Sequence, residues 1–172
     1  MDLGLLILRI VVGLLLIGHG TQKLFGWFGG SGIEKWVAGI GTRGFMPAML
    51  WGWAGALGET LGGILLALGF LSPLGSFAIA ASMVVAIVTA HWSKGIWNSK
   101  AGIEFPLTNI AAVLALALTG PGLYSLDHLF GISLALWVGW AAAVVLVGGA
   151  TVGLLTRKPA SASSPQPAAT SR

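Results

Sequence analysis

The sequence contains no cysteine and few charged residues. Without cysteine among its 172 residues, the chain cannot itself perform thiol–disulfide exchange or hold an iron–sulfur cluster or thiolate-bound haem. Asp, Glu, Lys and Arg make up 8% of the chain, whereas soluble domains carry about 25%. So few charges cannot cover a surface in water, but a bilayer requires an apolar outer face. Quinone, flavin and histidine-ligated chemistry remain open.

Long apolar runs are what the sequence has instead. Hydrophobic residues make up 56% of the chain, and a helix needs about 20 of them in a row to cross the hydrocarbon core. The runs show no two-residue alternation, so strands are disfavoured. The sequence predicts an all-α, polytopic transmembrane helical bundle with five spans, at about residues 3–22, 47–70, 74–92, 105–120 and 133–155. Arg9 interrupts the first run and no basic segment precedes it, so we expect a retained span rather than a signal peptide.

The basic residues predict the orientation of these spans. Eight of the nine Lys and Arg residues fall between spans one and two, between spans three and four, or after span five. They are Lys23, Lys35, Arg43, Lys94, Lys100, Arg157, Lys158 and Arg172. The loops at the other end have none, so the N-terminus is expected outside and the C-terminus in the cytoplasm. The net charge of +4 is thus interpreted as a topology signal toward a lipid bilayer, with no nucleic-acid partner.

The tryptophans agree with this orientation. Trp prefers the headgroup level of a membrane. Six of the eight fall at the inner interface of the predicted arrangement, and Trp137 and Trp140 fall near the outer end of span five. The six are Trp27, Trp36, Trp51, Trp53, Trp92 and Trp97.

Two segments outside the spans have their own character. Ser31-Gly32-Ile33-Glu34 fits a capping box at the start of a short amphipathic helix that Gly41 could end. This helix either lies on the inner membrane surface or docks on the bundle. Residues 157–172 are rich in Pro, Ala, Ser and Gln and are expected to form a disordered cytoplasmic tail.

Charged residues inside the spans are the first candidates for function, because lipid penalises them. Glu59 lies about 18 Å from either end of span two by helical rise. It is interpreted as a proton-handling or ligand-binding carboxylate, or as a structural ion pair or neutral Glu. Arg9 lies about 9 Å from the outer end of span one, so an Arg9–Glu59 pair is the hypothesis for its partner.

A second polar cluster is expected toward the inner face, where antiparallel helices bring their ends to similar depth. Its members are His19, Gln22, Lys23, His91, Glu104 and Asn109. The two histidines could donate to a quinone carbonyl, ligate haem or a metal, or be structural. Two histidines without a third ligand disfavour haem or a metal, and the sequence identifies no catalytic residue.

Small and hydroxylated residues complete the predictions for the spans. Thr60, Thr89 and Thr108 are expected to bond to helix carbonyls or across helices. The pairs Gly58-x-x-x-Gly62 and Gly149-x-x-x-Gly153 would let another helix approach closely, the second one between subunits.

Several motifs together resemble the DoxX family of bacterial membrane proteins, within the wider DoxX/DoxD-like group. They begin with Leu8-Arg9 and Gly13, followed by His19-Gly20-Thr21-Gln22-Lys23-Leu24-Phe25-Gly26. Gly58-Glu59 with Gly62-Gly63 follows in span two, and Gly120-Pro121-Gly122-Leu123-Tyr124-Ser125-Leu126-Asp127 comes last. The resemblance covers about residues 3–131, and it places Arg9, His19, Lys23 and Glu59 among the family's characteristic positions.

The resemblance implies a fold and a setting. It implies a four-helix DoxX-like membrane domain at residues 1–131 in the bacterial inner membrane. The fifth helix at 132–156, expected from hydropathy and from Arg157 and Lys158, and the tail at 157–172 depart from the family pattern. DoxD-type relatives are associated with thiosulfate:quinone oxidoreductase, and some DoxX proteins with oxidative-stress complexes. The expected function is a subunit linked to membrane redox metabolism that meets quinone near His19 and Glu59. The alternatives are a non-catalytic scaffold and a small-solute or proton pathway. Redox-complex subunits and a second copy of the chain are the candidate partners.

Overall fold

The structure is a computed structural model that describes residues 1–134 and 136–158, without the side chains of residues 136, 137 and 140. The predicted tail beyond Lys158 and the interfacial placement of Trp137 and Trp140 therefore lie outside the described part. Within that part the regular structure is all helical, as the sequence predicts.

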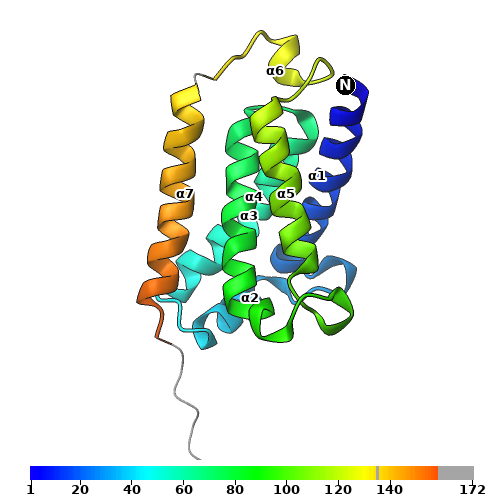
Figure 1. The fold of residues 1–172 in the computed structure, drawn as a ribbon. Helices are drawn as coiled ribbons and strands as arrows, with labels where there is room; N and C mark the ends of the chain where they lie inside the picture. Colours follow the sequence, from blue (N-terminus) through cyan, green and yellow to red (C-terminus); the bar gives the residue numbers. More distant parts are fainter. Residues whose placement is uncertain (135, 159–172) are drawn as a thin grey trace, which may run out of the picture.

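Five long helices form the bundle, and each coincides with one predicted span to within a few residues (Figure 1). They are α1 (Asp2–Phe25), α3 (Ala48–Leu68), α4 (Ser72–Ala86), α5 (Glu104–Thr119) and α7 (Leu136–Thr156). The axis of α4 continues through a π-helical turn, Ile87–His91, and a 3₁₀ turn, Trp92–Lys94. Shorter elements connect them: α2 (Gly32–Thr42), α6 (Leu126–Leu129) and 3₁₀ turns at Trp27–Gly29 and Asn98–Lys100.

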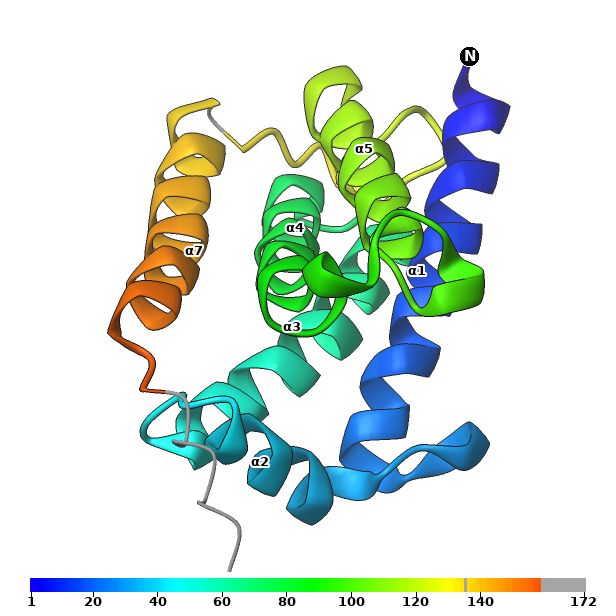
Figure 2. The same cartoon turned by 60° about the horizontal axis from the view of Figure 1, so that its bottom comes forward.

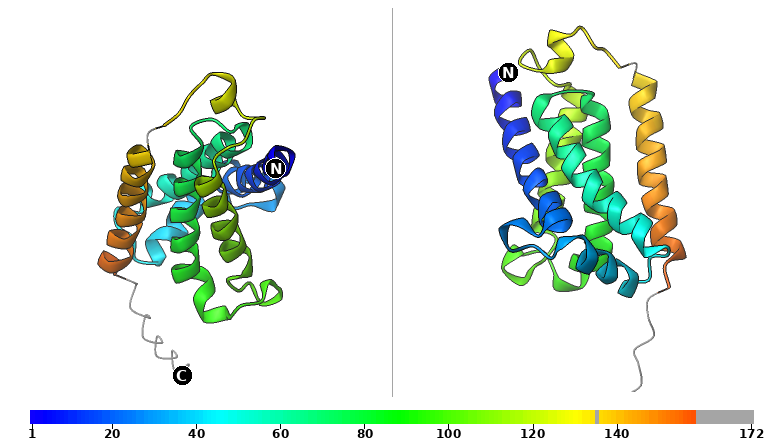
Figure 3. Two further views of the ribbon diagram at one scale, coloured as in Figure 1. Left: turned by 45° about the horizontal axis from the view of Figure 1, so that its top comes forward. Right: turned by 180° about the vertical axis from the view of Figure 1, so that it is seen from behind.

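The long helices alternate in direction. The N-terminus, the turn between α3 and α4, and α6 lie at one end of the bundle, and α2 lies at the other (Figure 1). The end of α7 is held near α2, because the Lys158 amide donates to the Gly44 carbonyl at 2.9 Å. α1 and α7 lie at opposite edges, with α3 and α4 between them (Figure 3).

The outer surface of the bundle is apolar. Two helical stretches, Asp2–Phe25 and Ser72–Lys94, are long and apolar enough to cross a membrane, and Glu104–Thr119 and Ala141–Thr156 are shorter apolar helices. α3 is not among them; it carries Glu59 and five glycines. Large exposed apolar side chains cover the helices, far more than a soluble monomer shows. Examples are Leu3, Ile7, Leu14, Leu57, Leu61, Leu118, Val144 and Leu155.

Glycines set the register between α1 and α3. A Cβ on Gly13 would lie 2.7 Å from the Ala67 Cβ, and one on Gly20 would lie 2.7 Å from the Thr60 amide nitrogen. These contacts leave no room for a side chain, so the two backbones pack directly together. The antiparallel pairing therefore brings residues near 20 on α1 to the level of residue 60 on α3.

α2 docks on the bundle, which is one of the two arrangements left open by the sequence. It lies across the end of the bundle beneath α1 and α3 (Figure 2). Trp36 donates its indole N–H to the Gly52 carbonyl of α3 at 3.0 Å, and a Cβ on Gly52 would lie 2.6 Å from Val37. The apolar face of α2 thus packs against the bundle, with Ile40 buried and Trp36 and Val37 half-buried, and the helix ends at Thr42 rather than Gly41.

The predicted capping box at the start of α2 is wrong. Ser31 is the N-cap residue, but its hydroxyl contacts the Gly32 carbonyl at 3.3 Å, not the amide of Glu34. The physical reason is the backbone of Ser31, which is helical (φ −82°, ψ −23°) instead of extended. In that conformation the side chain does not point at the free amides of the first turn.

The end of the bundle that holds the N-terminus is organised by Asp127. Its carboxylate accepts from the amides of Leu71 (2.7 Å) and Ser72 (3.0 Å) and from the Ser72 hydroxyl (2.8 Å). Its own amide donates to the Gly69 carbonyl at 2.9 Å. Asp127 thereby caps the first turn of α4, where free amides favour a negative charge. The motif that ends in Asp127 thus ties the loop after α5 to the turn between α3 and α4.

Candidate functional site

A cavity of about 680 Å³ opens in the half of the bundle that faces α2. Six helices contribute to its wall, because α1, α2, α3, α4 with its π turn, α5 and α7 all converge there. Most of the lining is apolar, and eight polar or charged side chains also reach it. They are His19, Lys23, Arg43, Glu59, Ser82, Thr89, His91 and Asn98.

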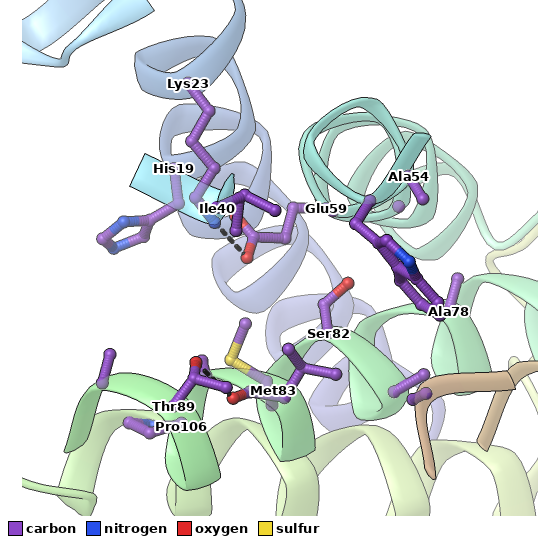
Figure 4. Close-up of a pocket in the computed structure, with 18 of the residues that line it drawn as sticks. His19, Lys23, Ile40, Ala54, Glu59, Ala78, Ser82, Met83, Thr89 and Pro106 are labelled. Atoms are coloured by element: carbon purple, nitrogen blue, oxygen red, sulfur yellow. Dashed lines mark hydrogen bonds and ion pairs between the residues drawn. The ribbon is translucent and has the colours of Figure 1, made fainter. Parts of the chain in front are cut away.

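An ion pair between Lys23 of α1 and Glu59 of α3 lies in this wall (Figure 4). The glycine register explains why the two meet, since Lys23 lies one turn beyond Gly20 and Glu59 lies beside Thr60. Glu59 is 3% exposed and Lys23 is 19% exposed, so water screens the pair weakly. The Glu59 Oε2 atom is buried and has no hydrogen-bond partner in the described chain.

The hypothesis of an Arg9–Glu59 pair is therefore wrong. Arg9 lies near the opposite end of α1, where a Cβ on Gly69 would collide with its guanidinium. Ten residues separate Gly69 from Glu59, which is about 15 Å of helical rise. The sequence matched the membrane depths of Arg9 and Glu59 because each depth was counted from the end of its own predicted span. The glycine contacts between α1 and α3, however, decide how the two helices align.

Arg9 is fully buried, with 0% exposure. Its Nη2 donates to the Tyr124 carbonyl at 2.6 Å, and its Nε and Nη1 atoms have no hydrogen-bond partner among the described residues. Arg9 thus lies beside the Gly69 turn that Asp127 organises, away from the cavity lining. The sequence marked Arg9 as a buried charge that needs partners, but it assigned the wrong one.

The inner polar cluster is brought together in part. The His19 ring packs on Phe105 with centroids 4.8 Å apart, and His91 Nδ1 lies 2.6 Å from the Ala101 carbonyl. Both histidines line the cavity with Lys23. The described residues hold no group of three metal-binding side chains.

Gln22, Glu104 and Asn109 have local roles outside the cavity lining. Gln22 donates to the Phe28 carbonyl at 3.3 Å. Glu104 accepts from the Asn98 amide, and Asn109 donates to the Phe105 carbonyl, both at 2.8 Å. The three threonines behave as expected, because each donates to the carbonyl four residues earlier. These are Thr60 (2.8 Å), Thr89 (2.7 Å) and Thr108 (2.8 Å).

Sequence reasoning missed the cavity residues of α2 and α7. On α2, Trp36 lies beneath Lys23 Nζ at 4.6 Å and within 5.5 Å of the Arg43 guanidinium carbon, which are cation–π distances. The clustering of Trp with Lys and Arg was a signal for this, but it was interpreted only as an interfacial anchor.

The glycine pair in α7 is used in part as predicted. A Cβ on Gly153 would lie 2.5 Å from Trp51, so this glycine lets α3 of the same chain approach closely, and a contact between subunits stays a prediction. Gly149 has open space beside it and lines the cavity.

Comparison with known proteins places the chain in a family. The model of the DoxX family matches residues 4–92, which is more than half of the chain. The chain belongs to the DoxX family. This DoxX protein is a membrane protein whose matched region includes Arg9, His19, Lys23, Glu59 and His91.

Two named relatives match over most of their length. "Inner membrane protein YqjF" of Escherichia coli (strain K12) is 31% identical over 130 residues, covering 74% of this chain and 92% of the relative. "Putative oxidoreductase CatD" of Bacillus subtilis (strain 168) is 26% identical over 126 residues, covering 73% of this chain and 86% of the relative. No solved structure matches. The family match ends at residue 92, before α7 begins.

Proposed function

We propose that this DoxX protein binds the headgroup of a membrane quinone in its cavity, as the quinone-binding component of an oxidoreductase in the bacterial inner membrane. The names of the two relatives support the two halves of this proposal, one as an inner membrane protein and the other as an oxidoreductase. The cavity volume of about 680 Å³ lies within the range of about 300–1,000 Å³ typical of small-molecule sites.

The observation that carries the proposal is the unpartnered Glu59 Oε2 atom beside Lys23 in a mostly apolar wall. A purely structural ion pair is expected to satisfy its buried oxygens, because an unpaired one costs about 1–3 kcal/mol or more. A ligand hydroxyl in the cavity would supply the missing hydrogen bond. A quinone offers carbonyls when oxidised and hydroxyls when reduced, so it matches a wall that has both a donor and an acceptor.

The residues of this wall have separate roles in the proposal. The Lys23 ammonium donates to a ring oxygen, and Glu59 Oε2 accepts the proton of a ring hydroxyl. His19 lies on the same wall and can donate or accept through its imidazole. The quinone supplies two-electron chemistry when bound. In this proposal the electrons come from a flavin or metal centre on a partner subunit; this chain, which has no cysteine, cannot hold an iron–sulfur cluster itself.

The membrane arrangement that goes with this proposal has five spans, with the N-terminus outside and the C-terminus in the cytoplasm. It is supported by the basic residues of α2 and of the loop after α4, which lie at the end of the bundle nearest the cavity. The quinone ring would then sit in the cytoplasmic half of the bilayer, where protons are taken from the cytoplasm.

The test compares Glu59→Gln with Glu34→Gln, the same change at an exposed position on α2. Each protein is placed in quinone-free nanodiscs, and binding of decylubiquinone is followed by quenching of tryptophan fluorescence, since Trp36 and Trp51 line the cavity. Glu59→Gln should weaken binding about tenfold, the effect of losing a hydrogen bond to a charged group, and Glu34→Gln should not. Wild-type protein that neither binds decylubiquinone nor carries extractable quinone from the cell would contradict the proposal.

A further inference from the structure

A second apolar space adjoins the cavity. It is a groove of about 570 Å³ between α3, α4 and α7, lined by aliphatic side chains and glycine. Four residues line both spaces: Gly58, Ala78, Val145 and Leu146. The groove therefore begins one residue from Glu59 and continues the cavity toward the end of the bundle that holds α6. Leu65 and Leu74 line its far part.

The packing of α7 explains why the groove exists. α7 approaches the bundle closely at two points. A Cβ on Gly139 would lie 3.4 Å from Pro73, and one on Gly153 would meet Trp51 at 2.5 Å. Between these two contacts, small residues of α7 such as Ala141 and Ala142 face α3 across the groove. The two glycine contacts thus hold α7 in place while the stretch between them stands away from α3.

We infer that this groove holds the hydrocarbon tail of the quinone whose ring binds beside Lys23 and Glu59. The inference rests on the proposed function. We assign the groove to the tail of that ligand because the polar cavity and the groove are continuous through Gly58. A lipid acyl chain would fill the groove but would leave the polar groups of the cavity without a partner. In a bilayer the tail gains nothing from leaving water, so the groove selects by close packing. α7, which the family match does not include, supplies one wall of it.

The test fills the groove without touching the cavity. Ala142→Phe and Ala141→Phe each place a ring in the groove, and Val144→Phe places the same ring on the exposed side of α7, where Val144 is 71% exposed. Each full-length variant is titrated in nanodiscs with decylubiquinone and with the tailless dimethoxy-methyl-benzoquinone that has the same ring. Thermal unfolding in detergent shows which variants fold, and comparing each ligand only with its own wild-type value removes differences in membrane partitioning.

Both groove variants should weaken the binding of decylubiquinone about tenfold and leave the binding of the tailless quinone within about twofold of wild type. Val144→Phe should change the binding of neither ligand. If the groove variants weaken both ligands equally, or neither, the tail is not in the groove and the inference is overturned while the ring site stands. If no quinone binds the wild type, the proposed function fails and the inference fails with it. If native mass spectrometry finds that Ala142→Phe loses a bound phospholipid rather than quinone, the groove is a lipid site and the inference is likewise overturned.

Discussion

Small residues on α1 and α3 decide where the polar side chains of this protein meet. Gly13 and Gly20 face Ala67 and Thr60, and this spacing sets Lys23 beside Glu59 and Arg9 beside Gly69. A shift of one helical turn is about 5.4 Å, enough to separate Lys23 from Glu59. The chemistry of the cavity therefore depends on residues that themselves have no functional group.

Substituting Gly20 tests this dependence. Gly20→Ala would put a methyl group 2.7 Å from the Thr60 amide nitrogen and should lower the free energy of unfolding by about 1–3 kcal/mol, as overpacking does. Gly18→Ala is the matched control, because nothing lies within 4 Å of its Cβ position. There the gain in helix propensity should raise stability by about 0.5–1 kcal/mol. The measurement is thermal or denaturant unfolding in detergent followed by tryptophan fluorescence; equal effects at both positions would contradict the register.

At this scale the sequence was informative about which residues matter and less so about their partners. Glu59, Arg9, Lys23 and His19 stood out because charge and imidazole are costly in lipid, and three of the four line the cavity. The pairing was missed because depth was counted from span ends. Matching Gly13 and Gly20 with the small residues of span two would have given the antiparallel register.

The next scale is the connection between elements, where Asp127 holds two loops. Its carboxylate caps α4 and its amide donates to the Gly69 carbonyl at the end of α3, so two helix ends depend on it. Hydropathy could not reveal this, because loop 121–132 carries no regular pattern from which α6 or its contacts could be read. The family resemblance marked the segment without giving its role.

Replacing Asp127 should therefore destabilise the fold. Asp127→Asn turns one acceptor oxygen into a donor, which would face either the Leu71 amide or the Ser72 amide and hydroxyl. The expected loss is about 1.5–3 kcal/mol, typical of losing a buried hydrogen bond to a charged group. Asp2→Asn is the control, since its exposed carboxylate accepts one bond from the Leu123 amide and its loss should cost less than the loss at Asp127.

Unfolding in detergent would rank the two variants. Faster proteolysis of loop 121–132 in Asp127→Asn would locate the effect. If Asp127→Asn unfolds at the wild-type temperature, the carboxylate does not hold the two loops together.

Elements that long apolar runs specify were predicted well, and those that depend on the local backbone conformation were not. The five long helices match the predicted spans because apolar length alone specifies them. The predicted capping box at Ser31 was wrong because the sequence matches the motif but the backbone of Ser31 is helical, so its side chain makes no capping hydrogen bond. The π turn at Ile87–His91 was not predicted, and no feature of sequence periodicity distinguishes its i→i+5 hydrogen bonding from that of the surrounding α-helix.

At the scale of the whole molecule, α7 connects the two ends of the site, and like α5 it lies beyond residues 4–92 that the family match covers. The named relatives match 92% and 86% of their own lengths with about three quarters of this chain. α7 closes one side of the cavity, walls the groove and ends beside α2 through the bond from Lys158 to Gly44. The last residues of α7 lie at the opposite end of the bundle from the N-terminus (Figure 1).

The direction of the chain in the membrane can be tested with reporters at two positions. We expect green fluorescent protein fused after Lys158 to fluoresce and alkaline phosphatase at the same site to be inactive, because Arg157 and Lys158 hold this end in the cytoplasm. Fused after Gly131, ahead of α7, the two reporters should give the opposite result, which serves as the internal control. An active phosphatase after Lys158 would mean that α7 does not span, and the cavity would then lose its fifth-helix wall in the membrane. Replacing Arg157 and Lys158 with Gln should leave α7 inserted but raise the fraction of outward C-termini, because the basic residues bias orientation while apolar length drives insertion.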